Sequence, residues 1–438
     1  MMEGPKSING RNFSVSVTAP EINATSISVG ESFSCALDNS SGIVKCGGGG
    51  SALGLGTNWS GSKDNEANEM GSNLGFVDLG TGRTATAIAS GRYHTCAILD
   101  NASVKCWGEN SAGQLGIGDT NSRGSKPNEM GDNLPTVDLG TGRTATAIAS
   151  GNHNTCAILD NASVKCWGSS EDGQLGQGNT TSLGDSANEM GDNLPSVDLG
   201  TGRTAIAIDT GWGHTCVILD NASVKCWGRN NVGQLGIGNN TNMGDGANEM
   251  GDNLPSVDLG TGRTATAIAA GAYVSCAILD NGSVKCWGAG GKLGLGNSTT
   301  LGDGANEMGD NLTIVNLGTG RTATAISMDN SNHTCVILDN DAVKCWGDGQ
   351  YGKLGSGGTS ILGDGANEMG DNLTIVNLGT GRTATAISPA RYHTCALLDN
   401  AAVKCWGQGN QGQLGQGNTA NLGDNANEMG DNLPAIDL

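Results

Sequence analysis

One stretch of the chain decides the fold, because it recurs from end to end. Residues 84–120 read TATAIASGRYHTCAILDNASVKCWGENSAGQLGIGDT, and a polar segment at 128–143 ends the unit with NEMGDNLPTVDLGTGR. Two short segments, His94–Leu99 and Ser103–Trp107, alternate in the manner of β-strands on either side of a turn at Asp100. No helical periodicity interrupts them. The unit therefore predicts a small antiparallel sheet.

The cysteines show how often the unit recurs. They fall in seven pairs, and the first member of a pair returns after 61, 60, 60, 60, 59 and 60 residues. Each unit has four short extended segments, here called A (Ala87–Ser90), B (His94–Leu99), C (Ser103–Trp107) and D (Pro135–Leu139). The small residues of segment A suit the crowded centre of a ring. The sequence predicts an all-β fold, a seven-bladed β-propeller with four antiparallel strands per blade. An open solenoid is the alternative.

The repeat also predicts the domain organisation. Residues 1–22 form an N-terminal segment, in which the alternation at Phe13–Val17 is a candidate closing strand. Residues 23–438 form a single propeller. The predicted blades span approximately 23–79, 84–139, 144–199, 204–259, 264–317, 322–378 and 383–438.

Composition excludes several classes of protein. The 438 residues include 74 Gly, are 36% hydrophobic and 3% aromatic, and carry a net charge of −20. Ordinary globular domains are about 45–50% apolar, so a thick conventional core is not expected. Affinity for nucleic acid comes from Lys and Arg, so a chain with this net negative charge is a poor partner for nucleic acid. No apolar run is long enough to predict a membrane span.

The repeated motif GxxHTCAILDNxxVKCWGxNxxGQLGxG resembles the repeat of the regulator of chromosome condensation family. The resemblance covers about residues 24–438 and implies a seven-bladed propeller. Family members are known for nucleotide exchange on a small GTPase, chromatin binding, ultraviolet-B sensing and secreted inhibition of β-lactamase, so the resemblance implies a fold more than a function. Two departures stand out: the paired cysteines, and an Asn/Asp/Glu/Gly-rich insert between segments C and D.

The paired cysteines predict an oxidising compartment. Cysteines on adjacent strands of one hairpin lie within disulfide range, and an even count paired in every unit favours disulfides over buried thiols. Zinc is disfavoured because each unit offers only two cysteines about nine residues apart. We expect an extracellular or cell-surface protein, a disulfide-containing variant of the family. The expected bridges are Cys35–Cys46, Cys96–Cys106, Cys156–Cys166, Cys216–Cys226, Cys276–Cys286, Cys335–Cys345 and Cys395–Cys405.

Asn-x-Ser/Thr triplets in the B–C turns are candidate N-glycosylation sites. Because an Asn-rich repeat produces such triplets by chance, turn formation alone is the competing interpretation. The candidate acceptors are Asn39, Asn101, Asn161, Asn221 and Asn281.

No catalytic pattern is visible. Four of the five histidines, all but His153, occupy one repeated position two residues before a cysteine, which indicates a structural role. A catalytic cluster should occur once and irregularly. We therefore expect no enzyme activity and no cofactor. Calcium is the one open candidate, because the insert GDGANEMGDN at 302–311 is rich in oxygen ligands, although these residues also simply form turns.

A binding surface is indicated by where the units differ. The B–C and D–A turns hardly vary, whereas the A–B turns and the start of the C–D loop do, and these two share one end of a propeller. Aromatic residues and Arg, the usual interface anchors, gather in the variable loops. Neutral drift of unconstrained loops is the competing interpretation. The predicted binding residues are Arg92, Tyr93, His153, Trp212, Tyr273, Tyr351, Arg391 and Tyr392.

We expect a secreted or cell-surface, non-catalytic propeller that acts as a binding or assembly module. Its expected partner is a protein or a glycan at the variable loops, with self-assembly into a glycosylated coat or fibre as one form. The alternative is a regulatory propeller, either an exchange factor for a small GTPase or a secreted enzyme inhibitor. Nuclear exchange is disfavoured by the net charge of −20 and the absence of a basic tail.

Overall fold

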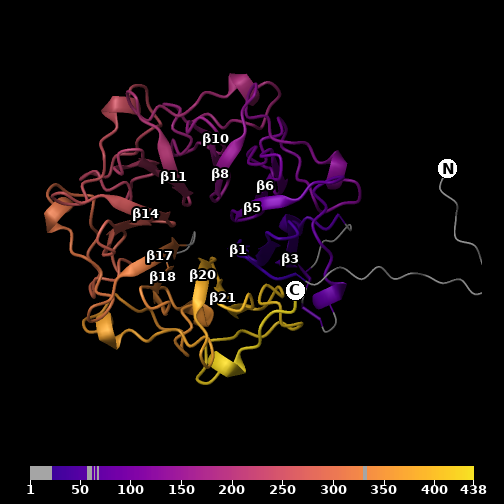
Figure 1. The fold of residues 1–438 in the computed structure, drawn as a ribbon. Coiled ribbons are helices and arrows are strands. Elements are labelled where there is room, and N and C mark those ends of the chain that lie inside the picture. Colours follow the sequence, from indigo (N-terminus) through magenta and orange to yellow (C-terminus); the bar gives the residue numbers. More distant parts are fainter. Residues whose placement is uncertain (1–21, 57–61, 64, 67–68, 329–332) are drawn as a thin grey trace, which may run out of the picture.

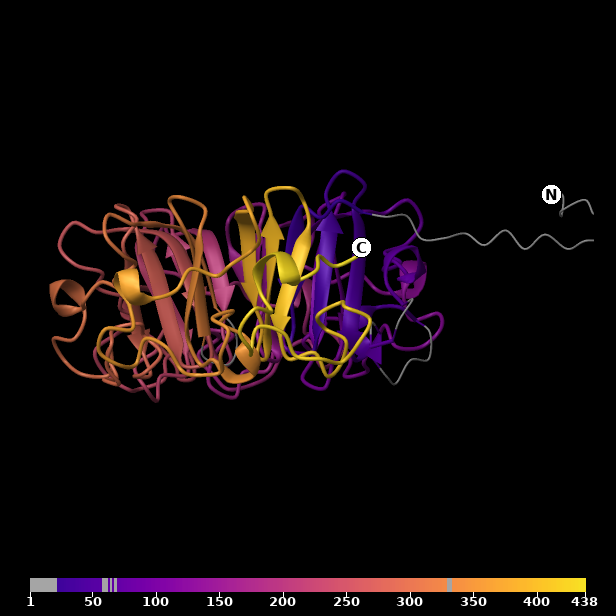
Figure 2. The same cartoon turned by 90° about the horizontal axis from the view of Figure 1, so that it is seen from below.

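Seven sheets are arranged in a ring around a central channel within the residues that the computed structural model describes, which are 22–56, 62–63, 65–66, 69–328 and 333–438 (Figure 1). Seen from the side, the ring is a flat disk and the strands run across its thickness (Figure 2). The sheets follow one another in chain order and define blades 1 to 7. The candidate closing strand at Phe13–Val17 lies outside the described residues.

Strands occupy the same three positions in every blade. The inner strands are β1 (Ser26–Val29), β5 (Ala85–Ser90), β8 (Ala145–Ser150), β11 (Ala205–Thr210), β14 (Ala265–Ala270), β17 (Ala323–Met328) and β20 (Ala384–Pro389). The middle strands are β2 (Phe33–Asp38), β6 (His94–Leu99), β9 (Asn154–Leu159), β12 (His214–Leu219), β15 (Val274–Leu279), β18 (His333–Leu338) and β21 (His393–Leu398). The outer strands are β3 (Ile43–Gly49), β7 (Val104–Gly108), β10 (Val164–Gly168), β13 (Val224–Gly228), β16 (Val284–Gly288), β19 (Val343–Gly347) and β22 (Val403–Gly407).

Helical structure in the described residues is limited to single 3₁₀ turns. They are η1 (Ser51–Leu53), η2 (Gly71–Asn73), η3 (Gly131–Asn133), η4 (Gly191–Asn193), η5 (Gly251–Asn253), η6 (Gly309–Asn311), η7 (Gln350–Gly352), η8 (Gly370–Asn372) and η9 (Gly430–Asn432). None of them has the length and apolar character needed to cross a lipid bilayer.

The prediction of four strands per blade is wrong for six of the seven described sheets, which have three. Blade 1 has a fourth strand, β4 (Ser62–Lys63). Elsewhere the predicted segment D touches the outer strand at one point, where the Val137 N–H donates to the Val104 carbonyl at 2.8 Å. Proline is not the cause, because blades 5 and 6 have Thr313 and Thr374 where blade 2 has Pro135 and are also three-stranded. A separate bridge between Gly108 and Arg123 covers the other end of β7.

The apolar core lies between blades. In the contact of blade 2 with blade 3, the Cys96–Cys106 bridge and Val104 of one sheet pack against Trp167 and Leu159 of the next. All five residues are at most 1% exposed. Because every blade buries one of its faces against its neighbour, the cores are thin and repeated, as the low apolar content requires.

Seven disulfides join the middle and outer strands in the described part of the chain, one in each blade. The paired cysteines stand directly opposite each other in the strand register, and their Cα atoms are 4.0–4.1 Å apart. The predicted pairing Cys35–Cys46, Cys96–Cys106, Cys156–Cys166, Cys216–Cys226, Cys276–Cys286, Cys335–Cys345 and Cys395–Cys405 is the one observed.

One carbonyl ties neighbouring blades together at most of the described junctions. The Gln114 carbonyl of blade 2 accepts hydrogen bonds from the Thr155 hydroxyl at 2.9 Å and the Trp167 indole at 3.0 Å, both from blade 3. The ring Nε2 of His94 lies 2.9 Å from the same hydroxyl, and since that hydroxyl donates to the carbonyl, His94 is the donor. The repeated histidine is thus a structural group.

Repeated cations hold the opposite end of each blade. Lys105 is 5% exposed, and its ammonium donates to the carbonyls of Leu79 at 3.0 Å and Gly131 at 2.7 Å. Burial lowers its pKa. Arg83 pairs with Asp100 across the B–C and D–A turns at 3.3 Å, and both side chains are half-exposed. These two repeated sets therefore belong to the scaffold.

The ring closes where the two ends of the propeller meet. The Ile22 N–H donates to the Leu438 carbonyl at 3.2 Å, and Ile22 and Ala24 join a core cluster with residues of blade 7. The C-terminus accordingly lies beside blade 1 in Figure 1. Blade 1 has Gly47 where other blades have tryptophan, so this junction lacks the indole that seals the others.

We predict that the indole hydrogen bond contributes measurably to stability. Trp167→Phe removes the bond to the Gln114 carbonyl, whereas Trp346→Phe removes an equally buried indole whose Nε1 has no hydrogen-bond partner among the described residues. Trp167→Phe should therefore cost about 1 kcal/mol more free energy of unfolding than Trp346→Phe, measured by urea denaturation. Equal losses would contradict the role given to the shared carbonyl.

We also predict that the protein is less stable in acid. Burial lowers the pKa of His94 to about 3 and that of His214 to about 4, from 6.5 when unfolded. Below pH 6.5 these histidines bind protons in the unfolded chain but stay neutral in the folded chain. The free energy of unfolding therefore falls as pH falls, by up to about 1.4 kcal/mol per pH unit for each histidine.

The double variant His94→Asn, His214→Asn isolates this effect, since blade 3 naturally has Asn154 at the same position. Its free energy of unfolding should fall less steeply than that of the parent between pH 7 and pH 5. An unchanged slope would mean that these histidines do not control the acid response.

Candidate binding face

The variable loops of different blades lie at one end of the disk, called here the variable face. In blade 2 the Glu109 N–H, at the start of the C–D loop, donates to the Tyr93 carbonyl of the A–B turn at 2.9 Å. The same contact joins Ser169 to His153, Arg229 to Gly213, Ala289 to Tyr273 and Gln408 to Tyr392. The Arg83–Asp100 pair joins the B–C and D–A turns at the other end, the constant face.

All eight predicted binding residues are on the variable face, and each is half-exposed. Their rings meet in pairs across neighbouring blades. Ring centroids are 5.4 Å apart in Trp212–Tyr273, 5.8 Å apart in Tyr351–Tyr392 and 6.4 Å apart in Tyr93–His153. The structure thus brings together the residues Arg92, Tyr93, His153, Trp212, Tyr273, Tyr351, Arg391 and Tyr392 as a segmented rim.

Cations stack on this rim. The Arg92 guanidinium is 4.7 Å from the centre of the Tyr93 ring, and Arg391 is 5.1 Å from that of Tyr392. Arg229 lies over Tyr273 at 5.3 Å. Four described arginines stand outside the repeated set, and three of them are these ring-stacked ones; the fourth, Arg123, pairs with Asp119. Cation–π contact fixes their planar groups beside the rings.

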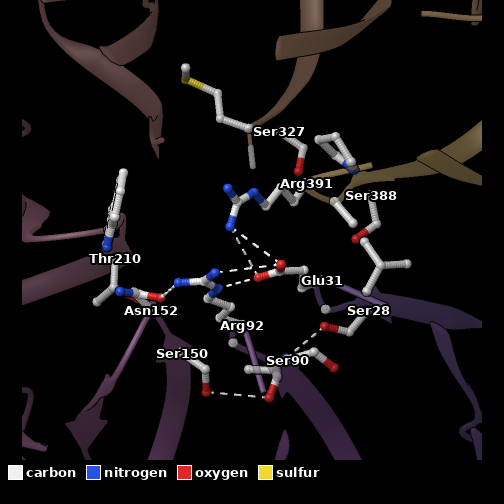
Figure 3. A pocket seen from close by; sticks show the side chains of 18 of the residues that line it. Ser28, Glu31, Ser90, Arg92, Ser150, Asn152, Thr210, Ser327, Ser388 and Arg391 are labelled. Atoms are coloured by element: carbon white, nitrogen blue, oxygen red, sulfur yellow. Dashed lines mark hydrogen bonds and ion pairs between the residues drawn. The ribbon is translucent and has the colours of Figure 1, made fainter. Parts of the chain in front are cut away.

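Glu31 of blade 1 joins the arginines of the two neighbouring blades. Its carboxylate pairs with Arg92 and with Arg391, the latter at 3.3 Å, and Arg92 also donates to Asn152 at 3.4 Å (Figure 3). Burial alone would lower the pKa of Arg92. The hydrogen bond and the negative charge of Glu31 outweigh burial, so the pKa of Arg92 is raised. Burial and Glu31 likewise raise the pKa of Tyr93.

The central channel opens on the variable face as a cavity of about 550 Å³. Inner strands of all seven blades line it, together with the first residues of the A–B turns. Most of these residues are small or polar. Asp209 is the one acid in the described inner strands. Burial raises its pKa to about 6. Its carboxylate accepts backbone hydrogen bonds from Thr210 at 3.0 Å and Ala270 at 2.8 Å.

The sequence analysis missed three residues of this face: Glu31, Asp209 and Arg229. Each occupies a repeat position that other blades fill with a residue of another kind, and Asp209 stands where blades 2, 3 and 5 have alanine. A position-by-position comparison of the units could have found them. The predicted binding residues were chosen from the variable loops for their aromatic rings, so acids at the channel mouth were not among them.

His153 is the histidine outside the repeated position. It belongs to the A–B turn of blade 3, and its Nδ1 is 4.0 Å from the Glu109 carboxylate. Burial lowers its pKa, against the opposing effect of Glu109. Its repeat position in blade 3 is filled by Asn154, which is fully buried.

The insert considered for calcium uses its carboxylates on its own backbone. Glu249 accepts from the N–H groups of Gly244 at 2.9 Å and Gly246 at 2.7 Å, and Glu307 and Glu368 do the same in their blades. Within the described residues no group of three or more His, Cys, Asp or Glu side chains is placed to hold a metal ion. The described insert is a turn closed by glutamate.

The candidate glycosylation residues lie on the constant face. Asn39, Asn101, Asn161, Asn221 and Asn281 are all exposed. The Asn101 Oδ1 accepts from the Ser103 hydroxyl at 2.7 Å, which closes the B–C turn. Asn161, Asn221 and Asn281 do the same, so turn formation is one function of these four, whereas in blade 1 Asp38 accepts from the turn serines in place of Asn39.

Comparisons with known proteins agree with the architecture. Family models described as the regulator of chromosome condensation (RCC1) repeat match residues 85–114, 145–174, 205–234, 265–292, 324–353 and 391–413, and also 103–158 and 223–278. Together these matches cover more than half of the chain.

Relatives with known names share the repeat. The chain is 28% identical to the ultraviolet-B receptor UVR8 of Arabidopsis thaliana over 77% of this chain and 68% of the receptor. It is 25% identical to the human E3 ubiquitin-protein ligase HERC2 over 63% of this chain, which spans only 5% of that protein.

A solved structure shows the same fold. Yeast RCC1 (Prp20), in a crystal structure with Kap60, is 16% identical with a TM-score of 0.60, and the match covers 100% of this chain and 91% of that one. Seven repeated sheets, the family matches and this likeness lead to one conclusion: the chain belongs to the RCC1 repeat family.

Proposed function

We propose that the protein is a non-catalytic binding module that holds a macromolecular partner on its variable face. The observation that carries the proposal is the placement of ring–ring and cation–ring contacts. They gather at one end of a scaffold whose other end repeats the same ion pairs from blade to blade. Tyr, Trp and Arg are the residues that most often dominate interface energies.

A protein is the partner that this rim supports best. The paired rings are half-buried and held by neighbours, so binding would cost little side-chain ordering. Yeast RCC1 (Prp20), which has the same fold, was solved in complex with Kap60. Neutral drift would scatter aromatic residues over both faces, whereas all four tyrosines of the chain are on this one.

Blade 1 provides an entry to the rim. Its A–B turn has Ser32 where blade 2 has Tyr93, and a groove of about 490 Å³ lies there. Gly49, Gly50 and Tyr93 are among the residues that line it. A loop or chain terminus of a partner protein fits a gap of this kind better than a flat surface does.

We place this module outside the cell or on its surface. Seven buried disulfides support that placement, because reducing compartments keep such thiols free. Assembly into a coat or fibre, glycan attachment, exchange on a GTPase and enzyme inhibition have no specific support among the described residues, so the proposal is confined to binding.

We predict that substituting the rim weakens partner binding without unfolding the propeller. The double variant Tyr93→Ser, Tyr273→Ser removes two aromatic anchors. Blade 1 has Ser32 at the equivalent position, so the scaffold accepts serine there. Partners are captured by chemical cross-linking on the tagged protein in extracellular material of the source organism. Affinity of the captured partner, measured with purified components, should fall at least tenfold in the variant.

Arg143→Gln is the matched control, since it removes an exposed ion pair with Asp160 on the constant face. Such a pair contributes only about 0–1 kcal/mol, so this variant should fold and bind as the parent does. If the rim variant keeps full affinity, or the control loses it, the partner does not use the variable face.

A further inference from the structure

Blade 4 differs from its neighbours at three positions that line the channel. It has Asp209, Thr210 and Trp212 there. Blade 5 has alanine at all three positions, Ala269, Ala270 and Ala272, and blade 3 has Ala149, Ser150 and Asn152. An acid and an indole therefore stand within four residues of one strand end where blade 5 has alanine. Other blades also vary at these positions, as Ser90 and Arg92 of blade 2 show, but among the described residues only blade 4 combines an acid with an aromatic ring there.

Asp209 provides hydrogen-bond acceptors. Two backbone N–H groups hold its carboxylate in place, from Thr210 and from Ala270 of the next blade. With a pKa of about 6 it is ionised at neutral pH, so it only accepts. The two backbone bonds leave other lone pairs of the carboxylate for a ligand.

Trp212 provides an apolar surface. Thr210, its neighbour in the channel lining, is 4% exposed, and its hydroxyl oxygen is buried away from the channel, so it offers no hydrogen bond to a ligand. Trp212, half-exposed at the cavity mouth, is braced by Tyr273 at 5.4 Å and so presents a fixed apolar surface.

The rest of the cavity supplies the complementary donors. Arg92 lies between Glu31 and Asn152 and donates to both, and serines of several inner strands add hydroxyls (Figure 3). Three acids, Glu31, Asp209 and Asp348, face two arginines across the lining. A lining that is polar and close to charge balance disfavours apolar ligands and strongly charged ones.

We propose that the channel mouth binds a neutral saccharide, with Asp209 hydrogen-bonded to its hydroxyl groups and Trp212 packed on a sugar ring. A saccharide combines many donor–acceptor hydroxyls with an apolar ring face, which matches this pair. The cavity of about 550 Å³ lies in the usual range for small ligands. The site goes beyond the proposed rim, because it requires no protein partner.

The test uses purified full-length protein and four disaccharides: maltose, cellobiose, lactose and N,N′-diacetylchitobiose. Saturation-transfer NMR detects binding and calorimetry gives its strength. Asp209→Ala and Trp212→Ala each install the residue that blade 5 has at that position, so the scaffold should tolerate them. We expect at least one disaccharide to bind with millimolar or better affinity, and each substitution to weaken it at least tenfold. Arg143→Gln should leave it unchanged.

Two results would overturn the inference. One is the absence of binding by all four sugars at 20 mM, which would make the cavity a water-filled channel. The other is binding that survives the double variant Asp209→Ala, Trp212→Ala. Choline serves as a competing probe: if it binds through Asp209 and the sugars do not, the ligand class is wrong. Trp212 belongs to both the rim and this cavity, but the rim test uses Tyr93 and Tyr273, neither of which lines this cavity, so the two proposals can fail separately.

Discussion

The contact between neighbouring blades is the constraint on which the rest of the structure depends. A small sheet of this composition cannot bury its own faces, so the disulfide-bridged faces of blades 1 to 6 pack against the tryptophan of the next blade. One carbonyl, that of Gln114 in blade 2, receives both the indole and the hydroxyl from across the junction. Closing the ring repeats this contact until no face is left exposed.

The same constraint separates the two ends of the disk. On the constant face, lysines, arginines and threonines bind the carbonyls and carboxylates of adjacent turns, which ties those turns to the scaffold. Fewer side chains on the variable face make such contacts with the scaffold, so residues there can change without loss of the fold. Function can therefore be sought in the departures from the repeat, which is where the aromatic rim and the acid of blade 4 are.

Much of the architecture could be predicted because it repeats. The number of units, the cysteine pairing and the end that carries the aromatic residues all follow from positions that recur with a fixed spacing. The fourth strand could not be predicted, since alternation at Pro135–Leu139 does not reveal that a single bond from Val137 is all that pairs it. Nor could Glu31 or Asp209, whose importance comes from neighbours in other blades that a single unit does not show.

Direct evidence on the disulfides is the sharpest test of this account, because thin cores between blades need the bridges for their strength. Native protein, purified without reductant, is unfolded in denaturant with an alkylating reagent and weighed by intact mass spectrometry, before and after reduction. The account predicts no alkylated cysteine before reduction and 14 afterwards. Free thiols throughout the native material would contradict both the disulfide bridges within the blades and the extracellular placement.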